Sequence, residues 1–181
     1  MLTGTGMAPL RTARLTLEPL VAAHAEAMFE LLQDPALYRH LDWGPPPSVE
    51  HLRSVYGLLE ARQSPDGSER WLNWVVKCDG RCIGYVQATA TDASCWVAYV
   101  LCSAQQGRGY AREATAAMIG HLAEAHGVRR FLATVEAANQ PSIGLLQALG
   151  FRGATPAEAT PHGLTATEQL WVREASGGVE A

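Results

Sequence analysis

Apolar and polar residues alternate in several short segments of this chain, which is the pattern expected of β-strands. Residues 14–18 alternate in this way, with Leu15 and Leu17 on one side. Longer apolar segments follow, and Asp79-Gly80 between the first two of them is typical of a tight hairpin turn. The pattern predicts strands over residues 14–18, 70–77, 82–90, 95–101, 131–135, 151–152 and 167–173.

Other segments carry apolar residues at the three- and four-residue spacing of an amphipathic helix. The predicted helices cover residues 21–32, 48–59, 109–126 and 139–149. Ser48 and Asn139 can cap two of them at the start, and Gly127 and Gly150 can end two. The order of elements predicts an α/β (α+β) fold with a mixed sheet. We expect a single domain over residues 1–181, with flexible segments at 1–9 and 176–181.

A short polar loop joins the predicted strand 95–101 to the helix 109–126 and contains Gly107 and Gly109. Glycines let the backbone curl, so that free N–H groups of the loop and of the first helical turn point at one spot. The positive end of the helix dipole adds attraction for an anion, and Arg108 can add a charge-assisted contact. The loop is therefore predicted to bind a phosphate or diphosphate.

The spacing of this loop excludes two common phosphate-binding motifs. No string fits a P-loop, and Arg112 stands where a dinucleotide fingerprint needs its third glycine. Instead, Gln106-x-x-Gly109-x-Ala111 resembles the Q/R-x-x-G-x-G/A signature of the GNAT superfamily of N-acetyltransferases. Further along, Asn139-Gln140-Pro141-Ser142-Ile143-Gly144-Leu145-Leu146-Gln147-Ala148-Leu149-Gly150-Phe151 resembles that family's second signature, N-x-x-S/A-I-x-L-x-x-x-L-G-F. Over residues 11–171 the chain is most similar to the ribosomal-protein N-terminal (Rim-type) acetyltransferases.

This resemblance implies a GNAT-like, mostly antiparallel sheet of about seven strands. Four helices would flank the sheet, which would splay between the strands 95–101 and 131–135. The resemblance implies acetyl-coenzyme A as the acetyl donor and no metal. Its pantetheine arm would lie in the splay, paired with the strand end at 100–102, which would also supply an N–H for the oxyanion. The implied cofactor-binding residues are Val100, Leu101, Cys102, Gln106, Gly107, Arg108, Gly109, Tyr110, Ala111, Arg112, Asn139 and Ser142.

The chemistry requires an acid and a base. An aliphatic amine has a pKa of about 10, so it must lose a proton before it attacks a thioester. Many relatives place a tyrosine acid where this chain has Leu146, and the resemblance implies that Ser142 protonates the departing thiolate instead. A purely backbone-bonding role for Ser142 is the alternative. Glu136 is predicted to be a catalytic residue and is a candidate for the base. His40 and a chain of water molecules stay open as alternatives for the base.

Several aromatic and polar side chains are expected to line the acceptor pocket, although aromatic residues on strands more often belong to the core. These are Tyr38, His40, Trp43, Trp74 and Tyr85.

The composition narrows the class of protein. The net charge of −4 and the absence of a basic run disfavour nucleic acid as a partner. The 4 cysteines show no C-x-x-C spacing, which favours reduced thiols. We find no signal-peptide pattern and no apolar run near the roughly 20 residues that cross a bilayer. We therefore expect a cytoplasmic protein without a membrane partner.

Together these features predict an acetyl-coenzyme A-dependent N-acetyltransferase that acts on a primary amine by direct attack, with a protein N-terminus as the first candidate. One alternative acceptor is a small-molecule amine such as an aminoglycoside or a polyamine. A second alternative is a non-catalytic acyl-coenzyme A-binding sensor, which Trp96 and Leu146 favour because relatives carry acid–base residues there. The sequence leaves monomer and homodimer open.

Overall fold

The computed structural model describes residues 7–41 and 43–175. Within these residues one 8-stranded sheet has the order β1-β2-β3-β4-β5-β6-β8-β7. The neighbouring strands are antiparallel except for β5 and β6, which are parallel. The strands are β1 (Leu10–Arg11), β2 (Leu15–Pro19), β3 (Arg70–Cys78), β4 (Arg81–Ala90), β5 (Cys95–Leu101), β6 (Arg130–Glu136), β7 (Arg152–Gly153) and β8 (Glu168–Glu174).

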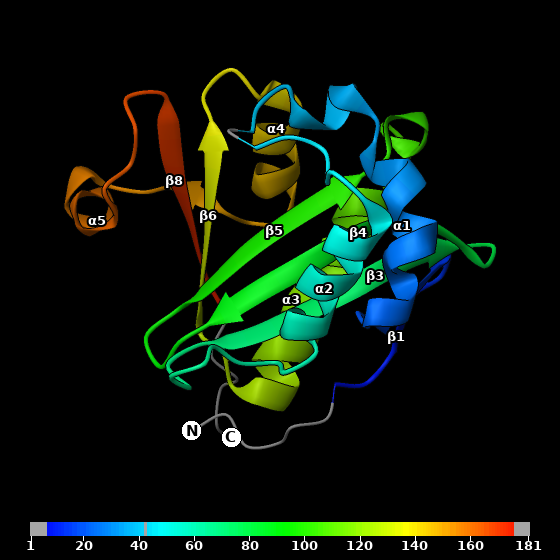
Figure 1. Ribbon diagram of the computed structural model, residues 1–181. Helices are drawn as coiled ribbons and strands as arrows, with labels where there is room; N and C mark the ends of the chain where they lie inside the picture. Colours follow the sequence, from blue (N-terminus) through cyan, green and yellow to red (C-terminus); the bar gives the residue numbers. More distant parts are fainter. Residues whose placement is uncertain (1–6, 42, 176–181) are drawn as a thin grey trace.

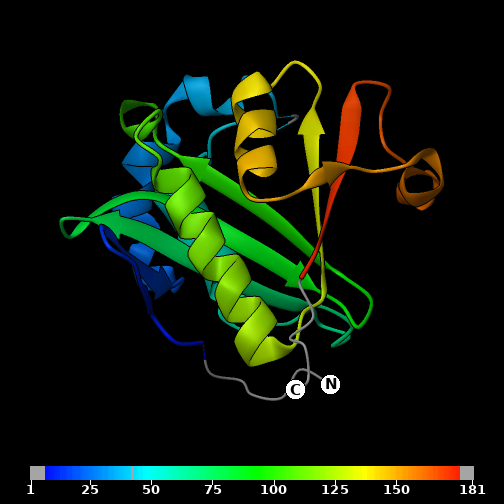
Figure 2. The ribbon, with the colours of Figure 1, turned by 180° about the vertical axis from the view of Figure 1, so that it is seen from behind.

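Helices cover both faces of this sheet. The α-helices are α1 (Ala25–Leu32), α2 (Val49–Leu59), α3 (Tyr110–His126), α4 (Gln140–Ala148) and α5 (Pro156–Ala159). Short 3-10 turns are η1 (Ala22–His24), η2 (Pro35–Tyr38), η3 (Ser103–Gln105) and η4 (Thr160–His162). Helices α1 and α2 lie on one face (Figure 1), and α3 and α4 lie on the other (Figure 2).

Each covered face has its own apolar core. Under α3 and α4 the core contains Leu17, Met118 and Phe131, all fully buried. Under α1 and α2 a second cluster forms around Met28 and Val75. Apolar burial of this kind is the main stabilising contribution to folding. The two layers hold the central strands rigidly between them.

The predicted elements match the observed ones closely. The caps are confirmed, since Ser48 Oγ accepts a hydrogen bond from His51 N at 3.1 Å and Asn139 Oδ1 accepts one from Ser142 N at 3.2 Å. Two elements were missed, β1 and α5. They contain 2 and 4 residues, which is too short for a strand or helix period to appear.

The predicted splay is present between β5 and β6. These strands pair only at Cys95 with Phe131 and at Trp96 with Leu132. Beyond that point they diverge toward α4, as Figure 1 shows. Within residues 7–41 and 43–175, the β6-facing edge of β5 from residue 97 onward therefore has no partner strand, and its backbone groups are available to a ligand.

The expected flexible segments fall largely outside the described residues, since 1–6 and 176–181 are not described. Ala8 is described, and its carbonyl accepts a hydrogen bond of 3.0 Å from the indole N–H of Trp74. None of the helices in the described chain is both long and apolar enough to span a membrane.

Candidate active site

A cavity of about 950 Å³ opens in the splay between β5 and β6. Its walls come from the β5 edge, the loop of residues 105–112 (the glycine loop), the start of α4, the ends of β6 and β8, and residues 36, 37, 39–41 and 43. Most of the predicted site residues line it: His40, Trp43, Val100, Leu101, Gln106, Gly107, Gly109, Tyr110, Ala111, Arg112, Glu136, Asn139 and Ser142.

The glycine loop owes its shape to its own residues. Gln106 closes it, because its side-chain amide donates to the carbonyl of Leu101 at 3.1 Å. Gly107 and Gly109 have φ of 74° and 79°, a left-handed conformation that other residues adopt only with strain. A Cβ at Gly107 would meet no atom within 4 Å, so backbone conformation rather than crowding requires glycine there.

Helix α3 begins at this loop without a side-chain cap. Its N-cap is Gly109, and no side chain hydrogen-bonds from that position to the first helical turn. Tyr110, Ala111 and Arg112, whose N–H groups belong to this first turn, all line the cavity. Open N–H groups and the positive end of a 17-residue helix form a favourable site for an anion.

Arg14 supports this loop from the segment before β2. Its guanidinium forms an ion pair with Glu113 at 2.6 Å and donates to the carbonyl of Arg108 at 3.0 Å. It also lies over the ring of Tyr110, with Cζ 4.5 Å from the centroid. Sequence reasoning missed Arg14 because 94 residues separate it from Arg108 and no local pattern joins them.

The end of β5 offers backbone donors to the cavity, but the predicted donor Cys102 is not one of them. Its N–H donates to the carbonyl of Ile83 at 2.9 Å and is used within the protein. Successive backbone amides along a strand point to opposite edges, so the N–H of Leu101 points to the open edge. Among residues 100–102, Leu101 is therefore the donor that faces the splay.

Ser142 lies opposite this edge and contacts a tyrosine that the sequence analysis did not select. The Tyr99 hydroxyl and Ser142 Oγ are 2.7 Å apart, and the same hydroxyl lies 3.3 Å from the Ser142 carbonyl oxygen. Burial raises the pKa of Tyr99, and the Ser142 hydrogen bond only partly offsets this effect. The phenol is therefore neutral and a donor at physiological pH. The sequence feature that could have identified Tyr99 is its position two residues before Leu101, on an exposed strand edge.

Two carboxylates lie at the far end of the cavity. Glu136 of β6 and Glu168 of β8 occupy opposite positions in the antiparallel pair, and both line the cavity. Glu136 accepts from Thr167 Oγ1 and Glu168 accepts from Thr165 N, each at 3.0 Å. Sequence reasoning found Glu136 but not Glu168, because the pairing that brings them together joins distant segments.

Five predicted residues do not line this cavity. Cys102 precedes the glycine loop, and Arg108 belongs to it, but the Arg108 guanidinium donates to Gln105 Oε1 at 3.0 Å instead of lining the cavity. Tyr38 lies behind Trp43, with the two ring centroids 5.1 Å apart.

The structure corrects the assignment of Trp74 and Tyr85. Trp74 is fully buried against α3 and belongs to the core. Tyr85 packs into the cluster under α1 and α2, on the other face of the sheet. Both lie on central strands, whose large aromatic side chains fill the layers between sheet and helices.

Residues 14–152 match the family model described as acetyltransferase (GNAT) domain. The match covers most of the chain and includes both signatures. The chain belongs to the GNAT acetyltransferase family. The sequence-based expectations of this family, of its fold and of an N-acetyltransferase are thereby confirmed.

Known GNAT proteins resemble this chain over most of its length. An uncharacterized N-acetyltransferase p20 from Bacillus licheniformis is 26% identical over 149 residues, which is 81% of this chain and 83% of that protein. The structure also resembles RimL, a ribosomal L7/L12 alpha-N-protein acetyltransferase solved with coenzyme A (TM-score 0.79, 21% identity, 94% and 100% coverage). It further resembles the microcin C7 self-immunity acetyltransferase MccE, solved with acetyl-coenzyme A and AMP (TM-score 0.76, 16% identity, 96% and 98% coverage).

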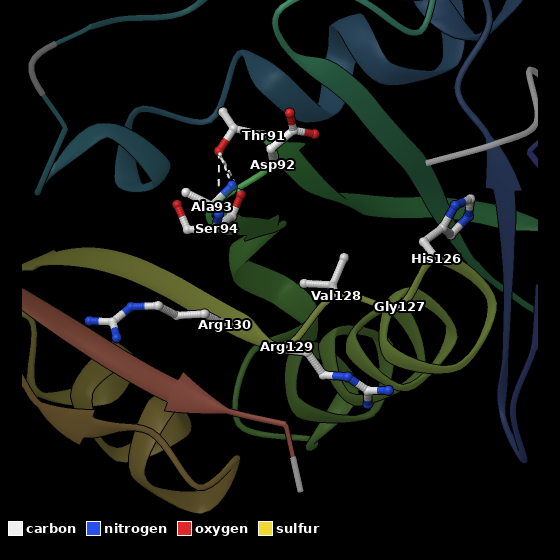
Figure 3. A pocket seen from close by; sticks show the side chains of 9 residues that line it. All are labelled: Thr91, Asp92, Ala93, Ser94, His126, Gly127, Val128, Arg129 and Arg130. Atoms are coloured by element: carbon white, nitrogen blue, oxygen red, sulfur yellow. Dashed lines mark hydrogen bonds between the residues drawn. The ribbon is translucent and has the colours of Figure 1, made fainter. Parts of the chain in front are cut away.

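A second cavity lies at the opposite end of the GNAT sheet and has about 180 Å³ (Figure 3). The β4–β5 turn meets the end of α3 there. Thr91 holds that turn by accepting from the N–H groups of Ala93 and Ser94. Arg130 at its rim forms ion pairs with Glu158 and Glu174. The splay cavity is several times larger and contains the residues of both signatures, so it is the stronger candidate.

Proposed function

We propose that this GNAT protein transfers an acetyl group from acetyl-coenzyme A to a primary amine, by direct attack of the amine on the thioester. The observation that carries the proposal is the convergence of the uncapped start of α3, the open edge of β5 and Ser142 on one cavity. A phosphorylated, elongated thioester needs these three features together.

The residues present fit coenzyme A. Open first-turn N–H groups suit a diphosphate, and the glycine loop leaves free space where side chains would otherwise project. Arg112 adds positive charge at the same wall. The unpaired β5 edge suits an extended arm that contains amide groups, because such an arm can pair with a strand. Coenzyme A supplies an activated acetyl thioester at the end of that arm.

Within the cavity the residues of this chain take complementary roles. The Leu101 N–H is oriented to donate to the acyl oxygen as negative charge develops on it. Ser142 Oγ is placed to donate its hydrogen to the departing sulfur. Glu136, His40 or water accepts the proton from the amine, and each of the two side chains lines the cavity. Excluding bulk water from this cavity strengthens each of these contacts.

The acceptor end supports a cationic substrate. Glu136 and Glu168 add negative charge where the amine must enter, which favours an ammonium group over an anion. The similarity to RimL makes the α-amine of a protein N-terminus the first choice. Trp43, 49% exposed at the cavity mouth, offers apolar surface to the residues that follow such an amine.

A small-molecule amine is the second candidate acceptor. The similarity to MccE, an immunity acetyltransferase solved with AMP, favours it. The deep cavity can also enclose a compact amine, because it continues beyond the β5 edge to the β8 end at Glu168.

Release of free thiol from acetyl-coenzyme A, measured over a panel of peptides and small amines, tests the proposal. We expect turnover with at least one class, and kcat/KM for N-terminal peptides above that for polyamines and aminoglycosides. A preference for small amines would favour the second candidate acceptor, a small-molecule amine, over the protein N-terminus. Tight binding of acetyl-coenzyme A without turnover on any amine would contradict the proposed activity and support a sensor.

A further inference from the structure

We propose that Tyr99 is the positioning residue for Ser142: its phenol donates to Ser142 Oγ and so frees the serine hydrogen to point at the sulfur of the acetyl donor. This inference rests on the proposed acetyl transfer and assigns a role to a residue that neither signature contains. The two hydroxyls come from two different elements that line the cavity, β5 and α4, and are 2.7 Å apart.

The argument begins with the number of hydrogens. A serine hydroxyl has one hydrogen, which it can donate only once, and a phenol also has one. If Ser142 donates to the Tyr99 oxygen, the phenol hydrogen can turn to the Ser142 carbonyl oxygen at 3.3 Å, and the serine has nothing left for a substrate. If Tyr99 donates to Ser142 Oγ, the serine hydrogen is free to point into the cavity.

The surroundings fix both partners in place. The backbone N–H of Ser142 donates to Asn139 Oδ1 at 3.2 Å, which holds the first turn of α4. Tyr99 is held by its strand, where it is paired with Val86 of β4. Burial of the phenol raises its pKa, so Tyr99 keeps its hydrogen at physiological pH. Both residues line the cavity at the open edge of β5.

A growing negative charge on sulfur selects between the two arrangements. During transfer the amine nitrogen forms a bond to the acyl carbon, the carbon–sulfur bond breaks, and the sulfur keeps the electron pair. That charge attracts the Ser142 hydrogen, and the Tyr99 hydrogen then stabilises the serine oxygen in a cooperative chain. Over one turnover the proton lost by the amine balances the proton gained by the thiol, so neither hydroxyl is consumed.

Substitution of Tyr99 by phenylalanine tests this role. Tyr99→Phe keeps the ring but removes the donor that orients and polarises the Ser142 hydroxyl, so we expect kcat to fall about tenfold with the KM for acetyl-coenzyme A unchanged. Ser142→Ala should lower kcat by a similar factor, and the double variant should be no slower than Ser142→Ala alone. Tyr56→Phe is the matched control, because the hydroxyl of this α2 residue is buried without a hydrogen-bond partner in the described chain. It should leave turnover at the wild-type value.

A binding measurement provides a readout that does not depend on turnover. A free Ser142 hydrogen stabilises the thiolate of bound coenzyme A, so the affinity for coenzyme A relative to desulfo-coenzyme A should rise several-fold between pH 7 and pH 9. Tyr99→Phe should reduce that rise, because the Ser142 hydroxyl then lacks the phenol that orients and polarises it, and Tyr56→Phe should keep it. Wild-type kcat in Tyr99→Phe, losses that multiply in the double variant, or an unchanged pH response would overturn the inference. Absence of turnover in the wild type would count against the proposed function instead, and the affinity ratio would still test Tyr99.

Discussion

Arg14 and Glu113 lie 99 residues apart in the chain and meet beside the glycine loop. The guanidinium Nη2 lies 2.6 Å from a carboxylate oxygen, Nε donates at 2.7 Å, and the backbone N–H of Arg14 donates to the same carboxylate at 3.0 Å. The Thr12 hydroxyl adds a fourth contact at 2.6 Å. The segment before β2 is thereby attached to the first turns of α3, and through Arg14 to the Arg108 carbonyl.

Arg14→Ala tests whether this attachment supports coenzyme A binding. The change removes the side-chain contacts to Glu113 and to the Arg108 carbonyl, so we expect the glycine loop to become more mobile. We expect a loss of stability of about 1–2 kcal/mol and a weaker dissociation constant for acetyl-coenzyme A, by calorimetric titration. Arg53→Ala is the control, since Arg53 pairs with Glu26 on the outer surface of α1 and α2. Equal affinities in both variants would show that Arg14 has no effect on the loop.

The same carboxylate predicts a pH dependence of stability. Burial alone would raise the pKa of Glu113, but hydrogen bonds from Thr12 and Arg14 outweigh it and lower the pKa below 4.5. A carboxyl whose pKa is lower in the folded state stabilises the fold above its unfolded pKa. That contribution is lost as the pH falls below about 4.5 toward the folded pKa.

Melting temperatures of the wild type and of Glu113→Gln between pH 6 and pH 3 measure this effect. The glutamine variant should be less stable at pH 6, and the difference should shrink as the pH falls. A constant difference over this range would mean that the Glu113 charge does not contribute.

Gly109→Val tests the glycine loop itself. At φ of 79° a β-branched residue is strained by about 1–2 kcal/mol, and the nearest neighbour of its Cβ is the end of the flexible Arg14 side chain at 3.4 Å. The fold should therefore persist, while the added side chain blocks approach of a diphosphate. We expect at least about a hundredfold loss of acetyl-coenzyme A affinity, a few kcal/mol.

Gly127→Val is a matched control for that variant. Gly127 has φ of 66° at the other end of α3, and its Cβ would meet no atom within 4 Å. The backbone strain is the same, but the position lies far from the splay. Similar melting temperatures with an affinity loss confined to Gly109→Val would support the loop as the binding site, and parallel losses would refute it.

The strands, the helices and the glycine loop could be predicted because their signals are local. Hairpin turns, caps and the strand–loop–helix order each depend on residues close together in the chain. Trp74 and Tyr85 show the limit of this reasoning. Period-two alternation separates the two faces of a strand but does not say which face meets a helix or how far a strand lies from the splay. Both aromatics were therefore assigned to a pocket, although they lie in the two cores.

The contacts that complete the site could not be predicted from sequence. Tyr99 meets Ser142 across 43 residues, and Arg14 meets Arg108 across 94. No periodic pattern in the sequence indicates contacts over separations of this length. The β6–β8 pairing likewise decides that Glu168 lies opposite Glu136. Such pairs follow from how the sheet assembles, and only the folded chain shows them.

Removal of the acceptor-end carboxylates should affect the amine and not the acetyl donor. Glu136→Gln keeps the shape and can still accept from Thr167, but it loses the negative charge that attracts an ammonium group. We expect kcat/KM for the amine to fall about tenfold, a difference of about 1.4 kcal/mol, with a further fall in the double variant Glu136→Gln/Glu168→Gln. The dissociation constant for acetyl-coenzyme A should stay constant. A loss of affinity for acetyl-coenzyme A instead would indicate that these carboxylates act where the acetyl donor binds.

A crystal structure of the protein grown with coenzyme A tests the central claim most directly, because it locates the diphosphate. Our account predicts phosphate oxygens within hydrogen-bonding distance of the N–H groups of residues 107–112, with the pantetheine arm along the open edge of β5 and its sulfur next to Ser142 Oγ. Coenzyme A bound with its diphosphate away from the start of α3, or in the cavity at the β4–β5 turn, would contradict it.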